Sequence, residues 1–250
     1  MKKQYHKSWP IFLTHLQAWY HPDNRKLPWK NIRDAYLVWV SEIFLQQTQA
    51  DRVVEFYLRF TAKFPTVNHL AKADFKQALP YFRGLGFYGR LRRMLETARA
   101  IVASSKLQDP SGKTQFPRQI SELEKLPGIG PYTARAIASF AYQQKVLAPD
   151  TNVVRILGRF FGALSNPPTP LKGGELTHTP KNILKNLDWF DANYPKDFNL
   201  NQVLMDLGAT ICLAKVPKCG KCPLHKKCQF VKNPGKLERD SSPPAERAGT

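Results

Sequence analysis

The strongest constraint on the fold is a short stretch near the C-terminal end, Cys212 to Cys228, which contains all four cysteines of the chain. Their spacing is C-x6-C-x2-C-x5-C, and the residues between them include five lysines and no acid. Four thiols this close in sequence indicate one compact loop wrapped around a single centre. We therefore expect the loop to anchor the end of the chain.

A metal centre is the expected content of this loop. Disulfides are disfavoured in a reducing compartment, so four thiolates indicate a four-thiolate zinc site or an iron–sulfur cluster. Zinc sites usually use two C-x2-C pairs, whereas single cysteines flank one pair here, which favours the cluster. The predicted ligands are Cys212, Cys219, Cys222 and Cys228. His225 lies inside the loop and is interpreted as a solvated polar residue, because four thiolates already complete a site.

The charge of the chain points to a polyanionic partner. Its 250 residues include 38 Lys and Arg against 19 Asp and Glu, a formal net charge of +19 at pH 7. Nucleic acid is the leading class of partner; a membrane surface is the alternative, although no long amphipathic basic helix is found. No apolar run approaches the length of a membrane span, and no signal-peptide core follows Met1. We therefore expect a soluble intracellular protein.

The hydrophobic pattern is helical almost throughout. Residues 34–60 are too long for one strand, and residues 73–82 and 90–105 space their apolar side chains by three and four. The fold class is therefore predicted to be all-α, with one large core or two modest ones. Pro and Gly mark residues 165–180 as a loop. Residues 233–250 are predicted to be a disordered tail, because they have almost nothing to bury.

A tight Gly-Ile-Gly turn lies between two helical segments in residues 123–142. Gly128 and Gly130 permit positive φ and a close backbone approach, and Pro131 suits the first turn of the second helix. N–H groups at the start of that helix would bind an anion, which in DNA is a backbone phosphate. An ordinary helix corner is the alternative. A glycine-rich echo at residues 84–89 is either a second DNA-facing loop or a helix boundary.

Two acids stand out by their positions. Glu42 interrupts an apolar helix, where burial would favour the protonated form that a general acid needs. The alternative for Glu42 is a place on an exposed stripe. Asp150 precedes a helical segment at residues 151–161, and it or Thr151 is well placed to cap that helix. A helix start keeps an aspartate ionised and directs it outward, so a capping role does not exclude catalysis.

The order of these motifs resembles the endonuclease III superfamily of DNA glycosylases. Within it, five motifs resemble the MutY-type adenine glycosylases: LPW at 27–29, SEIFLQQTQ at 41–49, GLGFYGR at 84–90, LPGIGPYTA at 126–134 and MDLGATIC at 205–212. The resemblance covers about residues 8–230. It implies the helix-hairpin-helix DNA glycosylase fold, which is all-α.

The resemblance also implies two lobes with DNA in the cleft between them. A six-helix barrel lobe with the helix-hairpin-helix would span residues 27–138. An N-terminal helix, residues 1–26, would join an iron–sulfur cluster lobe at residues 139–230. The disordered tail would follow as residues 231–250.

Particular residues acquire chemical roles from the resemblance. Glu42 matches the acid that protonates adenine as it leaves, and Asp150 matches the carboxylate that stabilises the oxocarbenium-like sugar. Asn152 would position water or that carboxylate. Relatives that also cut the strand carry a Schiff-base lysine where this chain has Tyr132, so the tyrosine implies a monofunctional glycosylase. The four cysteines would bind a structural [4Fe–4S] cluster that holds the five lysines near DNA.

Double-stranded DNA with a mismatch or an oxidised guanine is the implied partner, bound by a monomer and without a membrane. The target base must be flipped out of the duplex to be excised. The expected DNA-contacting residues are Gln46, Gln47, Phe87, Tyr88, Gly128, Gly130, Arg25 and Lys30. Of these, Gln46 or Gln47 would fill the gap in the stack, and Phe87 would wedge or stack. The expected location is the bacterial cytoplasm, in association with the nucleoid.

The chain departs from the family pattern in three places. Thr151 replaces the usual glycine after the catalytic aspartate, which would present the carboxylate differently. Phe87 replaces the first tyrosine after GLG and lacks its hydroxyl. About twenty residues follow Cys228. Full-length MutY proteins instead carry a C-terminal Nudix-like domain that helps recognise 8-oxoguanine, so selectivity for 8-oxoguanine over guanine stays open.

Two other functions remain open. A T:G mismatch thymine glycosylase would share the cluster, the tyrosine and the aspartate, but Glu42 with the paired glutamines is the adenine-type signature. A non-catalytic, cluster-bearing DNA-binding protein is the second alternative. The presence of both Glu42 and Asp150 argues against it.

Overall fold

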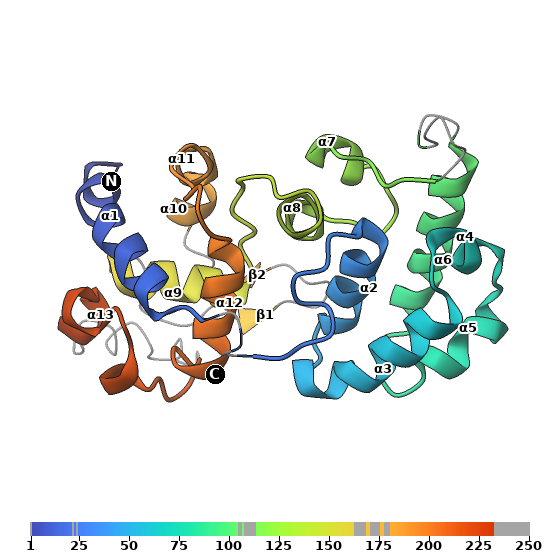
Figure 1. Cartoon of the computed structure of the whole chain (residues 1–250), viewed down its shortest axis with the longest axis horizontal. Coiled ribbons are helices and arrows are strands. Elements are labelled where there is room, and N and C mark those ends of the chain that lie inside the picture. The colour runs from blue at the N-terminus through green and yellow to red at the C-terminus, as the bar shows by residue number, and fades with distance from the viewer. Residues whose placement is uncertain are drawn as a thin grey trace, which may run out of the picture. The chain divides into compact units, whose positions relative to one another are not determined.

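The computed structural model describes residues 2–21, 23, 25–104, 107, 114–162, 169–170, 176–177 and 181–232. The chain forms two compact units (Figure 1). Unit 1 combines Met1–Asn24 with Pro149–Thr250, and unit 2 is the continuous segment Arg25–Ala148. The chain therefore starts in one unit, builds the other and then returns.

Unit 2 is built around one buried helix. Its elements are α2 (Ala35–Leu45), α3 (Ala50–Lys63), α4 (Val67–Lys72), α5 (Phe75–Phe82), α6 (Gly89–Ala103), α7 (Ile120–Leu123) and α8 (Pro131–Phe140). Nine of the eleven residues of α2 are buried, so this helix is apolar nearly all round. It packs against α3 and α8 (Figure 1). A polar side chain on α2 is consequently enclosed by its neighbours.

Local signals divide the long apolar stretch of unit 2 into separate helices. The Asp34 carboxylate accepts a hydrogen bond from the backbone N–H of Leu37 (3.0 Å) and starts α2. The helix ends at Leu45, and Gln47 adopts a left-handed φ of 58°. The glutamines predicted to contact DNA thus lie in the turn between α2 and α3.

Unit 1 is built around α9 (Thr151–Phe161), in which every residue from Val153 to Phe161 is buried. The other elements of unit 1 are α1 (Lys2–Trp19), β1 (Thr169–Pro170), β2 (Leu176–Thr177), α10 (Lys181–Leu184), α11 (Leu187–Ala192), α12 (Leu200–Thr210), the 3-10 turns η3 (Cys219–Lys221) and η4 (His225–Lys227), and α13 (Gln229–Lys232). Both α12 and α13 pack on α9.

Aromatic side chains of α1 pack against the C-terminal half of the chain in unit 1. The Phe12 ring of α1 lies 4.8 Å from that of Phe160, and the Tyr5 ring lies 4.8 Å from that of Phe161, centre to centre. The Trp9 indole donates a hydrogen bond to the carbonyl of Asn193 (2.8 Å). The N-terminal helix therefore packs into the core of unit 1. In Figure 1 it is the blue helix among the yellow and orange helices that come much later in the chain.

The structure confirms the predicted helical fold class. In the part of the chain that it describes, strand structure is limited to the two-residue antiparallel pair β1–β2. That pair lies inside the predicted loop at 165–180, most of which falls outside the described residues. The tail at 233–250 also lies outside them. No described helix combines the length and apolar character that a membrane crossing requires.

Two expected boundaries are wrong. Residues 139–148 group with unit 2 and not with the cysteine-bearing unit. The Tyr142 hydroxyl donates to the Phe116 carbonyl (2.8 Å), and the Gln144 amide donates to the Arg118 carbonyl (2.7 Å), so this segment is hydrogen-bonded to the stretch of unit 2 that precedes α7. The tail also cannot begin at residue 231, because α13 continues to Lys232.

Candidate functional site

The buried acid of unit 2 is paired with the hairpin tyrosine. Glu42 is 6% exposed in the middle of the buried face of α2. Because α2 packs against α8, the Tyr132 hydroxyl reaches the Glu42 carboxyl group, with 2.7 Å between the two oxygens. The placement of Glu42 on an exposed stripe is therefore wrong. The structure brings together two predicted site residues that are 90 positions apart.

The contact is compatible with both protonation states of the acid. A phenol can donate to a carboxylate, and its oxygen can accept from a protonated carboxyl group. The Glu42 carboxyl group can therefore gain or lose its proton without losing its contact with the Tyr132 hydroxyl. Tyr132 has no amine, so it cannot form a Schiff base with a sugar aldehyde.

The aspartate of unit 1 is held at a helix start. Asp150 is the N-cap of α9, and its carboxylate accepts the Val153 backbone N–H at 2.7 Å. The Asn152 amide donates to the other carboxylate oxygen at 2.8 Å. The capping role predicted for Asp150 is confirmed, and Thr151 becomes the first helical residue.

Burial opposes the ionised form of this aspartate. Desolvation raises the pKa of the Asp150 carboxyl from its ordinary value. The hydrogen bonds from Val153 and Asn152 and the charge of Arg155 act in the opposite direction and lower this pKa. The expectation that a helix start simply keeps Asp150 ionised is therefore incomplete, because these interactions offset only part of the burial.

Two buried arginines of α9 connect this site to the cysteine loop. Arg155 donates to the Asn152 side-chain oxygen (2.7 Å) and to the carbonyls of Gly208 (3.0 Å) and Cys212 (2.8 Å). Arg159 donates to the carbonyls of Leu213 and Ala214 at 2.7 Å. Sequence reasoning missed both residues. Their signal was present, since two arginines four residues apart interrupt an otherwise apolar helix.

A glycine in α12 leaves room for Asn152. A Cβ atom built on Gly208 would lie 2.6 Å from the Asn152 Cβ and 2.7 Å from its side-chain oxygen. No larger residue fits there without moving Asn152, which holds the Asp150 carboxylate. The glycine of the MDLGATIC motif is thus explained by the packing of α12 on α9.

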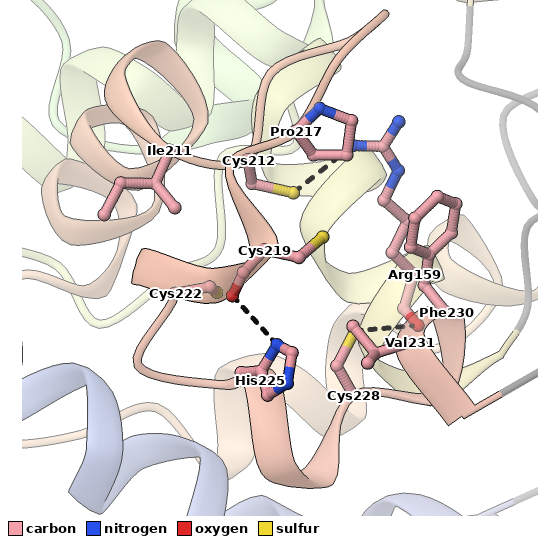
Figure 2. A pocket seen from close by; sticks show the side chains of 10 residues that line it. All are labelled: Arg159, Ile211, Cys212, Pro217, Cys219, Cys222, His225, Cys228, Phe230 and Val231. Carbon is pink, nitrogen blue, oxygen red and sulfur yellow. Dashed lines mark hydrogen bonds between the residues drawn. The ribbon is translucent and has the colours of Figure 1, made fainter. Parts of the chain in front are cut away.

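The four cysteines line one cavity of unit 1 (Figure 2). About 290 Å³ of this space is not filled by atoms, and part of it is open to solvent. Arg159 lines the same space, and its guanidinium contacts the Cys212 sulfur at 3.4 Å. The thiol of Cys228 donates to the Arg159 carbonyl at 3.5 Å. His225 also lines this space, and its exposed ring lies 2.9 Å from the Cys219 carbonyl, in keeping with its interpretation as a solvated polar residue.

The lining of this cavity is compatible with a metal centre, and the kind of centre stays a prediction. Among the described residues, no three Cys, His, Asp or Glu side chains are grouped as ligands of one metal ion. The cysteines nevertheless face one shared space, and none of them forms a disulfide. Burial raises the pKa of the Cys219, Cys222 and Cys228 thiols, so their thiolate forms need a nearby positive charge, which a bound metal would supply.

The hairpin turn precedes α8 as predicted, but only one of its glycines uses its conformational freedom. Gly128 has a φ of 73°, and a Cβ there would lie 3.0 Å from the Arg93 Cβ. Gly130 is extended (φ −89°) and does not use the positive φ that glycine permits. A Cβ on Gly130 would meet nothing within 4 Å, which leaves the backbone on that side open. Pro131 occupies the first turn of α8, as predicted.

The other predicted DNA-contacting residues lie in unit 2. Phe87 and Tyr88 are 65% and 43% exposed, which is unusual for large apolar side chains. Gln47 is exposed, and Gln46 is half-buried at the end of α2. Arg25 and Lys30 precede α2, where the Lys30 ammonium donates to the Arg25 carbonyl (3.1 Å).

The sites are distributed over both units. Glu42 and Tyr132 form one group in unit 2, and Asp150 and Asn152 form another in unit 1. The joint action of Glu42 and Asp150 on one nucleotide stays a prediction.

A helical fold with a hairpin turn, a buried acid and a four-cysteine loop is typical of one class of DNA repair protein. The family described as "HhH-GPD superfamily base excision DNA repair protein" matches residues 40–173, and the chain belongs to this family.

Curated relatives point to one branch of the family. The chain is 38% identical over 227 residues to an adenine DNA glycosylase of Mus musculus, which covers 87% of this chain and 41% of the relative. It is 36% identical over 213 residues to an adenine DNA glycosylase of Mycolicibacterium smegmatis, covering 84% of this chain and 66% of the relative. The chain thus spans about two fifths to two thirds of the length of these relatives.

Solved structures confirm the fold. A thermostable thymine-DNA glycosylase superposes with a TM-score of 0.74 at 26% identity, covering 91% of this chain and 98% of that one. An endonuclease III in a non-covalent DNA complex superposes with a TM-score of 0.65 at 20% identity, covering 94% and 99%. The second similarity, at this level of identity, shows the fold alone.

Proposed function

We propose that the chain is a monofunctional DNA glycosylase that hydrolyses the bond between adenine and deoxyribose where adenine is mispaired with 8-oxoguanine or guanine. The observation that carries this proposal is the buried Glu42 carboxyl group with the Tyr132 hydroxyl 2.7 Å away. It supports the proposal because the position at which strand-cutting relatives carry a lysine is occupied by a tyrosine, which has no amine and contacts the proposed acid. The adenine DNA glycosylases at up to 38% identity support the choice of base.

Glu42 is the proposed general acid. Adenine leaves poorly as an anion, so a proton must reach the base while the glycosidic bond breaks. Burial in α2 favours the protonated carboxyl, and the Tyr132 contact fixes its direction. The bonding electrons leave with the protonated base, and the sugar is left as an oxocarbenium-like cation.

Asp150 is the proposed stabiliser of that cation. Its two oxygens are oriented by the Val153 N–H and the Asn152 amide, so little rearrangement is needed when positive charge develops nearby. A water molecule then adds to the sugar carbon and loses its proton, which completes hydrolysis to an abasic site.

The four cysteines are proposed to bind a [4Fe–4S] cluster. Cys212, Cys219, Cys222 and Cys228 supply four thiolates around one cavity, and the family typically carries such a cluster. When bound, the cluster supplies cross-linking of the chain and no step of base removal. The exposed lysines of the loop, Lys215, Lys218, Lys221, Lys226 and Lys227, would then lie at fixed positions for phosphate contact.

The proposed partner is double-stranded DNA inside the cell, bound by a monomer. A formal net charge of +19 favours a polyanion, and the DNA complex of a structural neighbour supports this class of partner. The target adenine must leave the base stack to reach Glu42. The exposed Phe87 and Gln47 are available to enter the space it leaves.

The test is a mismatch assay on purified protein. Duplexes containing A:8-oxoG, A:G or T:G are incubated and then heated in alkali to cleave abasic sites. We expect cleavage at adenine that Glu42→Gln and Asp150→Asn abolish, and no strand cutting before alkali. Nicking without alkali would contradict the assignment of Tyr132. A colourless protein that contains zinc would contradict the cluster.

Thymine excision is the second candidate, and the similarity to a thymine-DNA glycosylase structure favours it. That structure aligns over almost the whole chain, but its 26% identity is below that of the adenine glycosylases. Base removal at T:G and at neither adenine mismatch would establish this candidate and exclude the first.

A further inference from the structure

A buried arginine in unit 2 has no role in the chemistry described above. Arg90, in the first turn of α6, is 5% exposed. Within the described part of the chain, no carboxylate forms an ion pair with it. A charge placed in a protein interior is costly unless polar groups surround it, so its contacts need an explanation.

Backbone carbonyls from two turns surround the guanidinium. One terminal nitrogen donates to the carbonyls of Ile43 and Gln46, both at 2.7 Å. The other donates to the carbonyls of Leu85 (2.9 Å) and Gly86 (3.1 Å). The first pair lies at the end of α2, where carbonyls lack helical partners and the helix dipole is negative. The second pair belongs to the glycine turn at 84–88.

The same guanidinium also supports an exposed aromatic ring. Its central carbon lies 5.4 Å from the centre of the buried Phe82 ring and 5.9 Å from that of Phe87. Both distances lie within the range of a cation–π contact. Phe87 projects from the turn with 65% of its surface exposed, so its position depends on the group beneath it.

Both turns contain a residue in an unfavourable backbone conformation. Gln47 and Phe87 have φ values of 58° and 50°, in the left-handed region that side chains other than glycine rarely adopt. Each directly follows a carbonyl that Arg90 binds, that of Gln46 or that of Gly86. Such conformations persist only where the surrounding structure holds them.

We propose that Arg90 is a positioning residue that joins the end of α2 and the turn at 84–88 into one rigid element for extruding the target base. This inference rests on the proposed function, because it assumes that Gln47 and Phe87 enter the DNA together. Arg90 itself touches neither DNA nor the reacting atoms. It acts through the backbone of the two turns.

Lysine cannot replace arginine in this arrangement. The guanidinium presents donors in a fixed plane toward two carbonyl pairs and offers a flat face to aromatic rings, whereas an ammonium group is a point charge. Burial and the nearby Arg93 lower the pKa of Arg90 to about 10, so the side chain still carries its charge at neutral pH. The hydrogen bonds from Arg90 to the two turns therefore do not vary over the physiological pH range.

The test combines base extrusion with a double-mutant cycle. Arg90→Lys and Phe87→Ala are made singly and together, and Arg99→Lys is the matched control on the same helix. Arg99 also binds a backbone carbonyl, that of Ala73 at 2.8 Å, but it is exposed and lies away from both turns. Extrusion is followed by 2-aminopurine fluorescence at the target position, and excision by single-turnover kinetics on an A:8-oxoG duplex.

We expect Arg90→Lys to lower the extrusion signal and to slow excision by about 10- to 100-fold, as a misplaced contact does. Binding to undamaged duplex should change less than about threefold, and Arg99→Lys should leave all readouts near wild type. In the double variant the two losses should not multiply, because both act through the Phe87 turn. Multiplying losses, or an extrusion signal unchanged by Arg90→Lys, would overturn the proposal.

Two controls keep the outcome interpretable. Thermal unfolding identifies loss of fold, and Phe87→Leu, which removes the ring but keeps an apolar side chain, replaces Phe87→Ala if the latter unfolds. Fluorescence reports extrusion without bond cleavage. If the wild type extrudes but does not excise adenine, the proposed function fails while the cycle on extrusion still tests Arg90. If the wild type extrudes no base from any duplex, the inference fails as well.

Discussion

The two units hold their carboxylates in opposite ways. In unit 2, Glu42 sits within a buried helix, and its carboxyl group lies 2.7 Å from the Tyr132 hydroxyl oxygen. In unit 1, Asp150 caps a helix and is surrounded by two hydrogen-bond donors and the charge of Arg155. The contrast teaches that two buried acids of one chain can have very different hydrogen-bond surroundings, on which the proposed division into a proton donor and a cation stabiliser depends.

The largest expected effect comes from removing the proton donor of unit 2. Glu42→Gln keeps the shape and a hydrogen bond to Tyr132 but cannot deliver a proton, so we expect the excision rate to fall by about 100- to 10 000-fold. The excision rate is measured by single-turnover kinetics. Glu96→Gln, an exposed acid on α6, is the matched control and should be near wild type. A loss of less than tenfold in Glu42→Gln would show that Glu42 is not the acid.

A smaller effect is expected from crowding the site of unit 1. Gly208→Ala places a methyl group 2.6 Å from the Asn152 Cβ, so we expect a destabilisation of about 1–3 kcal/mol, measured by urea unfolding. The activity should fall too, because Asn152 orients Asp150. Gly130→Ala is the control for stability only, since its methyl group meets open space but Gly130 is itself an expected DNA-contacting residue. Equal stability of the two variants would refute the close packing of α12 on α9.

A further comparison removes the partner of Glu42. Tyr132→Phe deletes one hydrogen bond to the acid while retaining the ring, and we expect about a tenfold slower excision with an unchanged dependence on DNA concentration. Single-turnover rates measured over a range of DNA concentrations separate an effect on the excision step from an effect on DNA binding. Tyr132→Lys supplies the missing amine. Trapping of a covalent complex by borohydride with this variant, and none with Tyr132→Phe, would support the monofunctional assignment.

The smallest expected effect is a shift of a pH profile. The Asn152 amide lowers the pKa of Asp150, which burial raises. Asn152→Ala removes that donor, so the pKa of Asp150 rises further and less carboxylate is present at a given acidic pH. Because the carboxylate is the active form, the acidic limb of the rate profile should move to higher pH. A shift to lower pH would contradict the assigned direction of the Asn152 hydrogen bond.

The features that the sequence predicted correctly are those that short-range patterns of residues determine. The Asp150 cap, the Pro131 helix start and the cysteine loop each depend on residues that lie close together in the sequence, so their spacing was enough to predict them. Glycine permits a positive φ without requiring it, so only the structure shows that Gly128 adopts one and Gly130 does not. The expected boundary between the two lobes at residue 138 was wrong, because it depends on contacts between residues far apart in the sequence. Tyr142 and Gln144 donate hydrogen bonds to the carbonyls of Phe116 and Arg118, which holds this segment in unit 2.

By itself, the amino-acid sequence determined the helical class, the placement of four thiols in one loop and the identity of the candidate acids, because periodicity, spacing and capping act over short distances. Only the tertiary structure decided which partner each acid has. Tyr132 reaches Glu42 because α2 packs on α8, and Arg155 links Asn152 to Cys212 because α12 packs on α9. Such contacts join residues tens of positions apart, and the packing of helices creates them.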